Sequence, residues 1–152
     1  MIRRPGKILA VASGGGHWVE LLRVMRGIED ADVVYVTVQR DYRHEVEGRR
    51  FHLINDATRW NKVAAALMAF RVLLIFLWER PDVVITTGAA PGYFALRFGR
   101  WLGARTVWID SIANAEELSL SGQMAGRYAD LWLTQWSHLA REGGPEYAGA
   151  VL

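Results

Sequence analysis

The sequence predicts one α/β domain built on a parallel sheet, and three observations support this fold class. Short apolar runs alternate with helical patterns along the chain of 152 residues. The runs are apolar at successive positions, which is typical of strands buried on both faces of a parallel sheet. The first run leads directly into glycines and a helical pattern. With 51% hydrophobic residues, a chain of this length can bury the core that one domain needs.

The elements follow one another in nearly strict alternation. Strands are expected at 8–12, 33–38, 51–54, 83–87, 106–109 and 131–134. Helices are expected at 18–28, 61–79 and 92–102, with a short one near 121–128. Ligands of parallel sheets bind outside the carboxyl ends of the strands. The residues that follow each strand are therefore the first candidates for a functional site.

A glycine turn follows the first strand: Gly14, Gly15 and Gly16 precede His17 and a helical pattern. Glycines allow close backbone approach and leave amide hydrogens free, and the helix adds the positive end of its dipole. The junction indicates a site for anions such as phosphate, with His17 as a candidate base that accepts a proton from a substrate hydroxyl. The same residues also fit a plain tight turn with a capping histidine.

Two common nucleotide-binding motifs do not fit this turn. A G-x-G-x-x-G fingerprint needs its third glycine at Val19, and an acidic ribose ligand where the second strand ends in Gln39 and Arg40. No Gly-Lys-Ser/Thr follows, so the turn is not a Walker loop. A small nucleotide-dependent enzyme therefore stays only as a minor alternative.

The expected helix at 61–79 is apolar on nearly every side. At 100° per residue, one face gathers side chains that would pack on the sheet: Val63, Leu67, Phe70, Leu74, Leu77 and Trp78. The side away from the sheet is expected to contact a membrane surface or a partner through Met68, Val72, Ile75 and Phe76. A second helix of the domain is the other possible cover. The run contains Arg71 and is too short for an ordinary membrane span, which needs about 20 apolar residues.

Two later turns are expected at the same edge of the sheet. The small-residue turn after the fourth strand contributes Thr87, Gly88 and Gly92. This turn and the earlier glycine turn, facing one crevice, can hold a diphosphate between two helix N-termini. The segment after the fifth strand contributes Asp110, Asn114 and Glu116. Helix capping and turn formation are the more ordinary explanation of each of these polar residues.

Composition excludes several classes of function. The chain has no cysteine, which removes disulfides, thiolate metal sites and cysteine nucleophiles. The four histidines lack the spacing of a metal set, and no metal or other cofactor is expected. The net charge is only +2 with dispersed arginines, so nucleic acid is not an expected partner. The start, MIRRPGK, predicts neither a signal peptide nor a membrane span.

Three segments carry a resemblance to a known family: SGGGHWVELLRV, PDVVITTGAAPGYFA and VWIDSIANAEELSLSGQMAGRYADLWLTQW. They are similar to the membrane-anchoring, Alg14-like subunit of the eukaryotic two-chain UDP-GlcNAc transferase. They also resemble the bacterial PssD-like subunits of polysaccharide biosynthesis. The resemblance covers nearly the whole chain. It implies a single Rossmann-like domain over 1–152, equivalent to the N-terminal, acceptor-side half of a GT-B glycosyltransferase.

The resemblance also implies an activity. Such a subunit belongs to a heteromeric inverting glycosyltransferase that moves a sugar from a UDP-sugar to a lipid-pyrophosphate-linked saccharide. A separate PssE-like chain would bind the donor, and the complex would sit peripherally on the cytoplasmic face of a membrane. The glycine turns would hold the acceptor diphosphate, with His17 as base or hydroxyl-orienting group. Asp110, Asn114 and Glu116 would contact the sugar or the partner. A non-catalytic adaptor that recruits a catalytic partner to the membrane is the alternative.

Overall fold

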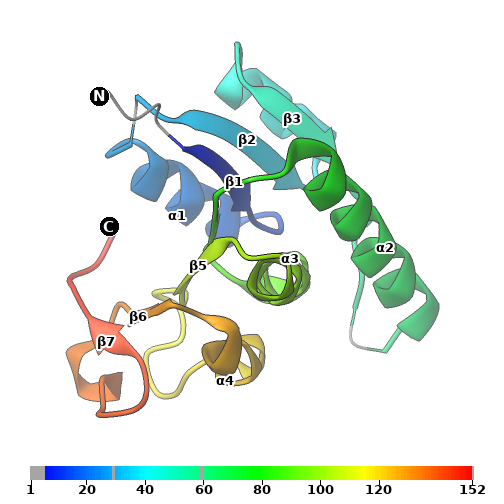
Figure 1. Ribbon diagram of the computed structural model, residues 1–152. Coiled ribbons are helices and arrows are strands. Elements are labelled where there is room, and N and C mark those ends of the chain that lie inside the picture. Colours follow the sequence, from blue (N-terminus) through cyan, green and yellow to red (C-terminus); the bar gives the residue numbers. More distant parts are fainter. Residues whose placement is uncertain (1–5, 29, 59, 152) are drawn as a thin grey trace.

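A parallel sheet forms the centre of the computed structural model, which describes residues 6–28, 30–58 and 60–151 (Figure 1). Its strands are β1 (Lys7–Val11), β2 (Asp32–Thr37), β3 (Arg50–Leu53), β4 (Val83–Thr86), β5 (Arg105–Ile109), β6 (Leu131–Thr134) and β7 (Glu146–Tyr147). They lie in the order β3-β2-β1-β4-β5-β6-β7, and every neighbouring pair is parallel. The strand order therefore reverses between β1 and β4, where parallel sheets of this kind bind their ligands.

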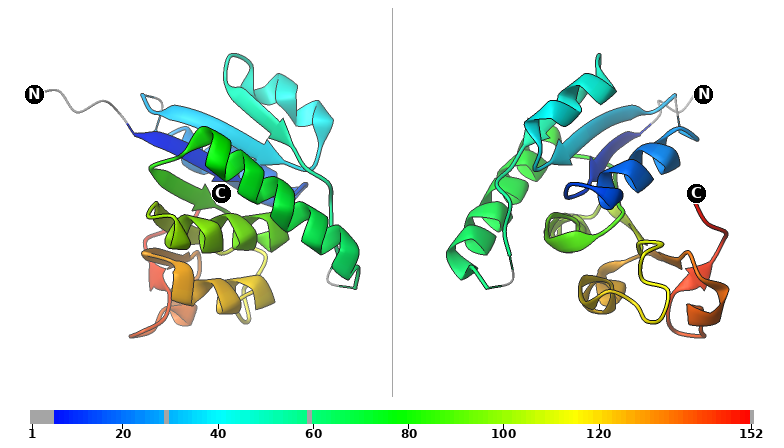
Figure 2. Two further views of the ribbon diagram at one scale, coloured as in Figure 1. Left: turned by 45° about the vertical axis from the view of Figure 1, so that its right-hand side comes forward. Right: turned by 180° about the vertical axis from the view of Figure 1, so that it is seen from behind.

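Helices cover both faces of the sheet. They are α1 (Gly16–Met25), α2 (Lys62–Glu79), α3 (Ala89–Trp101) and α4 (Leu120–Ala125), with the 3₁₀ turns η1 (Arg40–Val46), η2 (Gly126–Tyr128) and η3 (Ser137–Leu139). Figure 2 shows α2, α3 and α4 stacked over one face, while α1 lies on the other. Crossovers between parallel strands are right-handed, and the strands are added in one direction from β1 to β3 and in the opposite direction from β4 to β7, so the helices of the two halves cover opposite faces.

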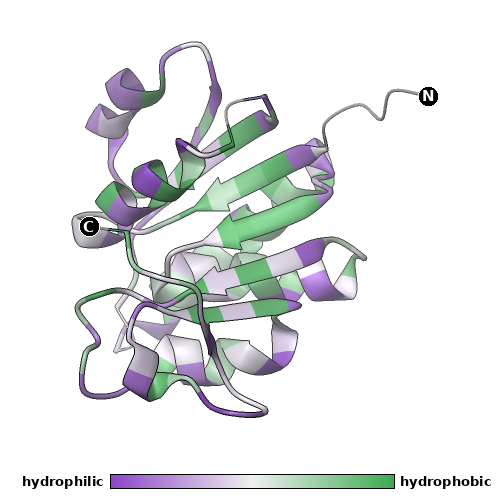
Figure 3. Cartoon of the chain, turned by 90° about the vertical axis from the view of Figure 1, so that its left-hand side faces the viewer, coloured by the Kyte–Doolittle hydropathy of each residue, from purple (hydrophilic) through white to green (hydrophobic). Residues whose placement is uncertain are grey.

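Two apolar cores follow from the alternation of side chains along the strands. In β1, Leu9 and Val11 join the core under α2, α3 and α4, whereas Ile8 and Ala10 join the core under α1. Both sets are buried. The central strands are accordingly apolar along most of their length, as the green colouring of Figure 3 shows. A sheet buried on both faces explains why the sequence shows continuous apolar runs and not an alternating pattern.

The predicted fold class is confirmed: the chain is a single Rossmann-like α/β domain with a parallel sheet. Each expected strand and helix is present, with small differences at the ends. Three elements were not expected, namely the 3₁₀ turns η1 and η3 and the short edge strand β7. None of them has an apolar pattern of its own, because β7 has two residues, η3 has three and η1 buries only Val46. Their conformations depend on the surrounding structure.

The expected orientation of α2 is wrong. Met68, Val72 and Phe76 are buried in the core against the sheet and α3, and Ile75 packs beside them. The face expected to cover the sheet is instead exposed: Val63, Leu67, Phe70, Leu74, Leu77 and Trp78. Met68, Val72, Ile75 and Phe76 therefore do not form a surface for a membrane or a partner. Within the described part of the chain, no helix is long and apolar enough to cross a membrane.

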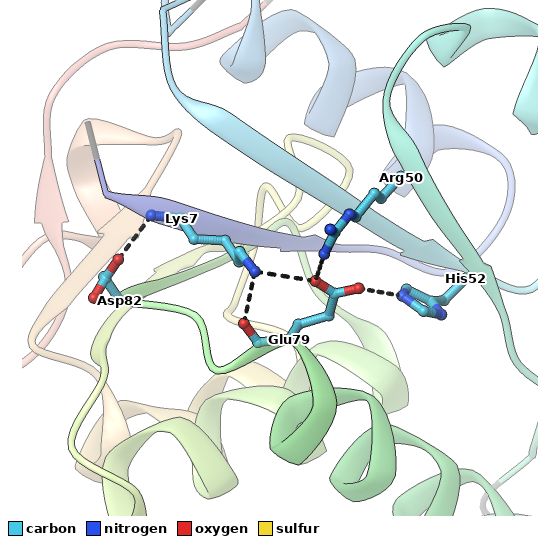
Figure 4. A network of polar contacts seen from close by, with 5 residues as sticks. All are labelled: Lys7, Arg50, His52, Glu79 and Asp82. Carbon is cyan, nitrogen blue, oxygen red and sulfur yellow. Dashed lines mark hydrogen bonds and ion pairs between the residues drawn. The ribbon is translucent and has the colours of Figure 1, made fainter. Parts of the chain in front are cut away.

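A buried carboxylate explains which side of α2 faces inward. Glu79 ends the helix on the same stripe as Phe76, and its side chain is 1% exposed. Its Oε2 accepts from Arg50 at 2.6 Å and from Lys7 Nζ at 3.3 Å, while its Oε1 is 2.9 Å from His52 Nε2 (Figure 4). This network lies at the amino end of β1 and along β3. It joins the end of α2 to β1, which is distant in sequence, and to β3, which precedes the helix.

The Glu79 network makes stability depend on acid. Burial alone would raise the pKa of the Glu79 carboxyl, but hydrogen bonds from His52, Arg50 and Lys7 together lower it below its ordinary value. A lowered pKa means that the carboxylate stabilises the fold above the unfolded-state pKa, near 4.5, and that this contribution is lost as the pH falls.

We therefore expect Glu79→Gln to reduce the free energy of unfolding at pH 7 by about 2 kcal/mol and to flatten its decline between about pH 5 and pH 3. Urea titrations of both proteins over this range provide the measurement. Glu142→Gln, which changes an exposed carboxylate, is the control. Parallel acid profiles for Glu79→Gln and the unmodified protein would show that the network does not contribute in this way.

Candidate functional site

The two glycine turns meet at the carboxyl ends of β1 and β4. These strands are neighbours, and Val11 lies opposite Thr86 at their ends. The turns are joined by two hydrogen bonds between the same two residues. His17 Nδ1 lies 2.9 Å from the Thr87 carbonyl oxygen, and Thr87 Oγ1 donates to the His17 carbonyl oxygen at 2.5 Å. The expectation that the turns lie side by side is thus confirmed.

The bond to Thr87 determines the tautomer of His17. A backbone carbonyl can only accept a hydrogen bond, so Nδ1 must carry the hydrogen. The lone pair of the neutral imidazole is then on Nε2. His17 is half-buried in the first turn of α1, at the point where the strand order reverses. This arrangement provides a proton acceptor of fixed orientation, which is what a general base requires.

The first glycine turn leaves the start of α1 without a side-chain cap. Gly15 is the N-cap residue, with a φ of 67° that favours glycine, and no side chain caps the helix. Gly15 and Gly16 are exposed, and Gly14 is half-buried beside Gln39 and Tyr42. The Gly15 amide donates to the Tyr42 hydroxyl at 2.9 Å. The remaining first-turn amides carry the positive end of the helix dipole, which suits an anionic group.

The second turn is strained and lies against His17. Gly88 has a φ of 125°, and Ala89, which follows it, has a φ of 64°. A left-handed conformation costs a non-glycine residue about 1 kcal/mol. A Cβ atom at Gly88 would lie 3.1 Å from the His17 ring. Gly88 and the buried Thr87 therefore shape the environment of His17, and α3 also begins without a side-chain cap.

Gly92 is not part of the surface between the turns. It is buried in α3, and a Cβ atom there would lie 2.0 Å from Thr86 Oγ1. The residue is glycine because the helix must approach β4 closely, as in other domains where a third glycine packs helix on strand. The expectation that Gly92 contacts an acceptor is thus corrected to a packing role.

Asp110 has a structural position, which corrects its expected contact with a sugar. The residue is 1% exposed, and both carboxylate oxygens already have partners. Oδ1 accepts from Ser119 Oγ at 2.6 Å and from Trp108 Nε1 at 3.1 Å, and Oδ2 accepts from the Ser119 amide. Ser119 in turn caps α4. Asn114 is half-buried and Glu116 is exposed on the loop that follows, so both side chains lie at the surface.

Sequence reasoning missed two polar residues that organise this edge, Glu20 and Gln135. Both are buried, and Gln135 Nε2 donates to Glu20 Oε1 at 2.9 Å and to the Asp110 carbonyl at 3.1 Å. A charged residue in the apolar segment that follows His17 is the signal that was available. In the described ranges, no three side chains of metal-binding type come close enough together to hold a metal ion.

The fold and the paired glycine turns define the class of protein: a Rossmann-like domain with the fold of the N-terminal half of a GT-B glycosyltransferase. The family model described as "Oligosaccharide biosynthesis protein Alg14 like" matches residues 56–151, and the chain belongs to this family. One relative is a UDP-N-acetylglucosamine transferase subunit ALG14 of Eremothecium gossypii, which is 27% identical over 169 positions, covering 90% of this chain and 75% of the relative. Another ALG14 subunit, from Yarrowia lipolytica, is 25% identical over 176 positions, covering 96% of this chain and 81% of the relative.

Solved structures share the fold at low sequence identity. MurG of Acinetobacter baumannii superposes with a TM-score of 0.76 and 14% identity, over 94% of this chain. The UDP-GlcNAc 2-epimerase of Methanocaldococcus jannaschii gives a TM-score of 0.66 and 12% identity, over 84% of this chain. The chain spans only 45% of the MurG structure and 39% of the epimerase structure.

Proposed function

We propose that this chain is the acceptor-binding subunit of a two-chain inverting glycosyltransferase. The donor would be a UDP-sugar, and the acceptor a lipid-pyrophosphate-linked saccharide. The observation that carries the proposal is the meeting of two uncapped helix starts with a histidine of fixed tautomer between them. Membership in the Alg14-like family and the names of the two ALG14 relatives support the same reaction class.

The two helix starts fit the acceptor diphosphate. The free amides at the start of α1, with exposed Gly15 and Gly16, would bind one phosphate. The start of α3, where Gly88 and Ala89 hold a left-handed backbone, would bind the other. Asn114 and Glu116 lie on the loop beyond β5 and would contact the acceptor sugar or the partner chain.

His17 would then act on the acceptor hydroxyl. As the hydroxyl oxygen attacks the anomeric carbon of the donor sugar, Nε2 takes the hydroxyl proton. The bond between that carbon and the β-phosphate oxygen breaks, and UDP leaves with the bonding electrons. A single displacement of this kind inverts the anomeric centre. Thr87 keeps the hydrogen on Nδ1, so the Nε2 lone pair is available to accept this proton.

A partner chain would complete the site. The two ALG14 relatives are each named as a subunit of a UDP-N-acetylglucosamine transferase, and a subunit implies a further chain. The donor site is therefore expected on a separate donor-binding chain, and this chain alone should bind UDP-sugars weakly or not at all. Calorimetric titration of the isolated chain with UDP-GlcNAc measures this, and sugar transfer should appear only after the donor-binding chain is added. Tight UDP-GlcNAc binding by the isolated chain would refute the split-enzyme proposal.

The exposed face of α2 would hold the complex on a membrane surface. Its large apolar side chains recur at alternating spacings of four and three residues from Val63 to Leu77, and Phe70 is 57% exposed and Trp78 is 79% exposed. The segment 62–78 contains no acidic residue, whereas the exposed Lys62, Arg71 and Arg80 lie on or beside this face. An apolar stripe with basic residues and an exposed tryptophan fits an anionic lipid interface.

Replacing apolar residues on this face should release the protein from vesicles. We expect the double change Phe70→Gln and Leu74→Gln to lower binding to phosphatidylglycerol-containing vesicles at least tenfold, because two inserted side chains are lost. Flotation measures the bound fraction, and circular dichroism should stay unchanged because both side chains are exposed. Val19→Gln, on exposed α1 surface, is the matched control. Failure of the unmodified protein to float would refute the lipid contact.

A further inference from the structure

Glu20 is a buried carboxylate close to the proposed base. It lies three residues after His17 in α1, and therefore on the same side of the helix. The residue is 4% exposed. Its Oε1 accepts hydrogen bonds from the Ile112 amide at 2.8 Å and from Gln135 Nε2 at 2.9 Å. One carboxylate oxygen thus joins α1 to the loop after β5 and to the segment after β6.

Both backbone polar groups of Ile112 are held by side chains. Its amide donates to Glu20, and its carbonyl accepts from Trp136 Nε1 at 2.7 Å. Further along the same loop, His138 Nε2 bonds the Ala115 carbonyl. The segment 112–117 has no helix or strand of its own. Its position relative to His17 is therefore determined by these side-chain bonds, and Glu20 is the one that comes from the His17 helix.

The second oxygen of Glu20 has no partner. Oε2 is buried, and none of the described residues donates to it. Leaving a buried carboxylate oxygen unpaired costs free energy, and such a group in a folded protein calls for a reason. The two bonds to Oε1 offer that reason, because bonds to a charged acceptor are about twice as strong as bonds to a neutral one. Helix packing alone would be better served by an apolar side chain.

We infer that Glu20 is a positioning residue, which holds the segment 112–117 at a fixed distance from His17. The inference rests on the proposed function, in which that loop carries Asn114 and Glu116 toward the acceptor. Glu20 does not touch the reacting atoms. It acts through the Ile112 amide, so that an acceptor bound at the glycine turns meets the loop and the imidazole in one geometry.

Amide hydrogen exchange tests the hydrogen bond between the Ile112 amide and Glu20 in the isolated chain. Glu20→Ala should speed exchange of the Ile112 amide at least tenfold and shift the Trp136 indole N–H resonance, because the peptide between them is released. Amides in the centres of β1 and β4 should keep their exchange rates. Glu20→Gln keeps a carbonyl acceptor, and should restore Ile112 protection to within threefold of the unmodified protein. Glu117→Ala removes an exposed carboxylate of the same loop and is the matched control.

Unchanged Ile112 exchange in Glu20→Ala would overturn the inference. Equally faster exchange in β1, β4 and the loop would overturn it too, since that would mean general destabilisation. With the donor-binding chain added, Glu20→Ala should raise the KM for the acceptor at least tenfold and leave the KM for the UDP-sugar unchanged. An unchanged acceptor KM would also contradict the inference. Absence of transfer in the unmodified complex would refute the proposed function alone, since the exchange result needs no activity.

Discussion

His17→Ala should lower turnover of the assembled transferase by roughly 10² to 10⁴, the usual contribution of a general base. The loss is expected in kcat, because the imidazole acts on the hydroxyl proton in the transition state and the backbone amides hold the diphosphate independently. Steady-state kinetics with the donor-binding chain present provide the measurement. Folding should change little, since the half-buried ring has one hydrogen bond, to the Thr87 carbonyl.

The same variant distinguishes a catalytic role of this chain from a role as a non-catalytic adaptor. If all catalytic groups were on the partner chain, His17→Ala would cost less than about threefold, and the adaptor alternative would be favoured. His44→Ala serves as the control, because that side chain is 81% exposed in η1 and its ion pair with Glu47, at 3.8 Å, is also exposed. It should leave kcat unchanged.

Gly92→Ala should destabilise the fold by at least about 2 kcal/mol, although it adds one methyl group. The new Cβ atom would lie 2.0 Å from Thr86 Oγ1 and 3.0 Å from Thr86 Cβ, and Thr86 is fully buried at the end of β4. Thr86 Oγ1 also accepts from the Gly88 amide at 3.1 Å. A displaced threonine would therefore disturb the strained turn beside His17 as well as the packing of α3. Urea denaturation measures the loss.

Gly16→Ala is the matched control for Gly92→Ala. A Cβ atom at Gly16 would meet nothing within 4 Å, and the residue is already in α1. This change should alter stability by less than about 1 kcal/mol, with the sign toward greater stability, because alanine favours a helix. Equal losses in the two variants would show that close packing of α3 on β4 is not what requires glycine at 92.

The fold could be predicted because its signals are local. Apolar runs ended by small residues, such as the one before Gly14, mark strands whatever surrounds them. The meeting of the Gly14 and Thr87 turns was also predictable, since carboxyl ends of parallel strands share one edge. Features that depend on three-dimensional packing could not be predicted from these sequence signals. The burial of Gly92 and Asp110 is an example, because neither residue type indicates whether it faces a ligand or the core.

The error in α2 has a specific physical reason. A helix that is apolar all round has no periodicity to choose its inward face. The larger stripe, from Val63 to Trp78, was the natural choice, yet the smaller one is buried. The deciding residue is Glu79, whose carboxylate must reach Arg50 and His52, so the stripe that contains Phe76 faces inward. A charged residue that ends an apolar helix on one stripe was the signal available in the sequence.

The two edge strands of the sheet, β3 and β7, limit how another protein can bind to this one. β7 offers two residues of edge, and β3 offers four, of which Arg50 and His52 are tied by side-chain bonds to Glu79. Short edges and charged residues on an outer strand disfavour the addition of a foreign strand. We therefore expect any companion chain to attach through helices and loops, so that recognition depends on side chains and not on a shared ladder of backbone hydrogen bonds. The same property protects the folded chain from edge-to-edge aggregation.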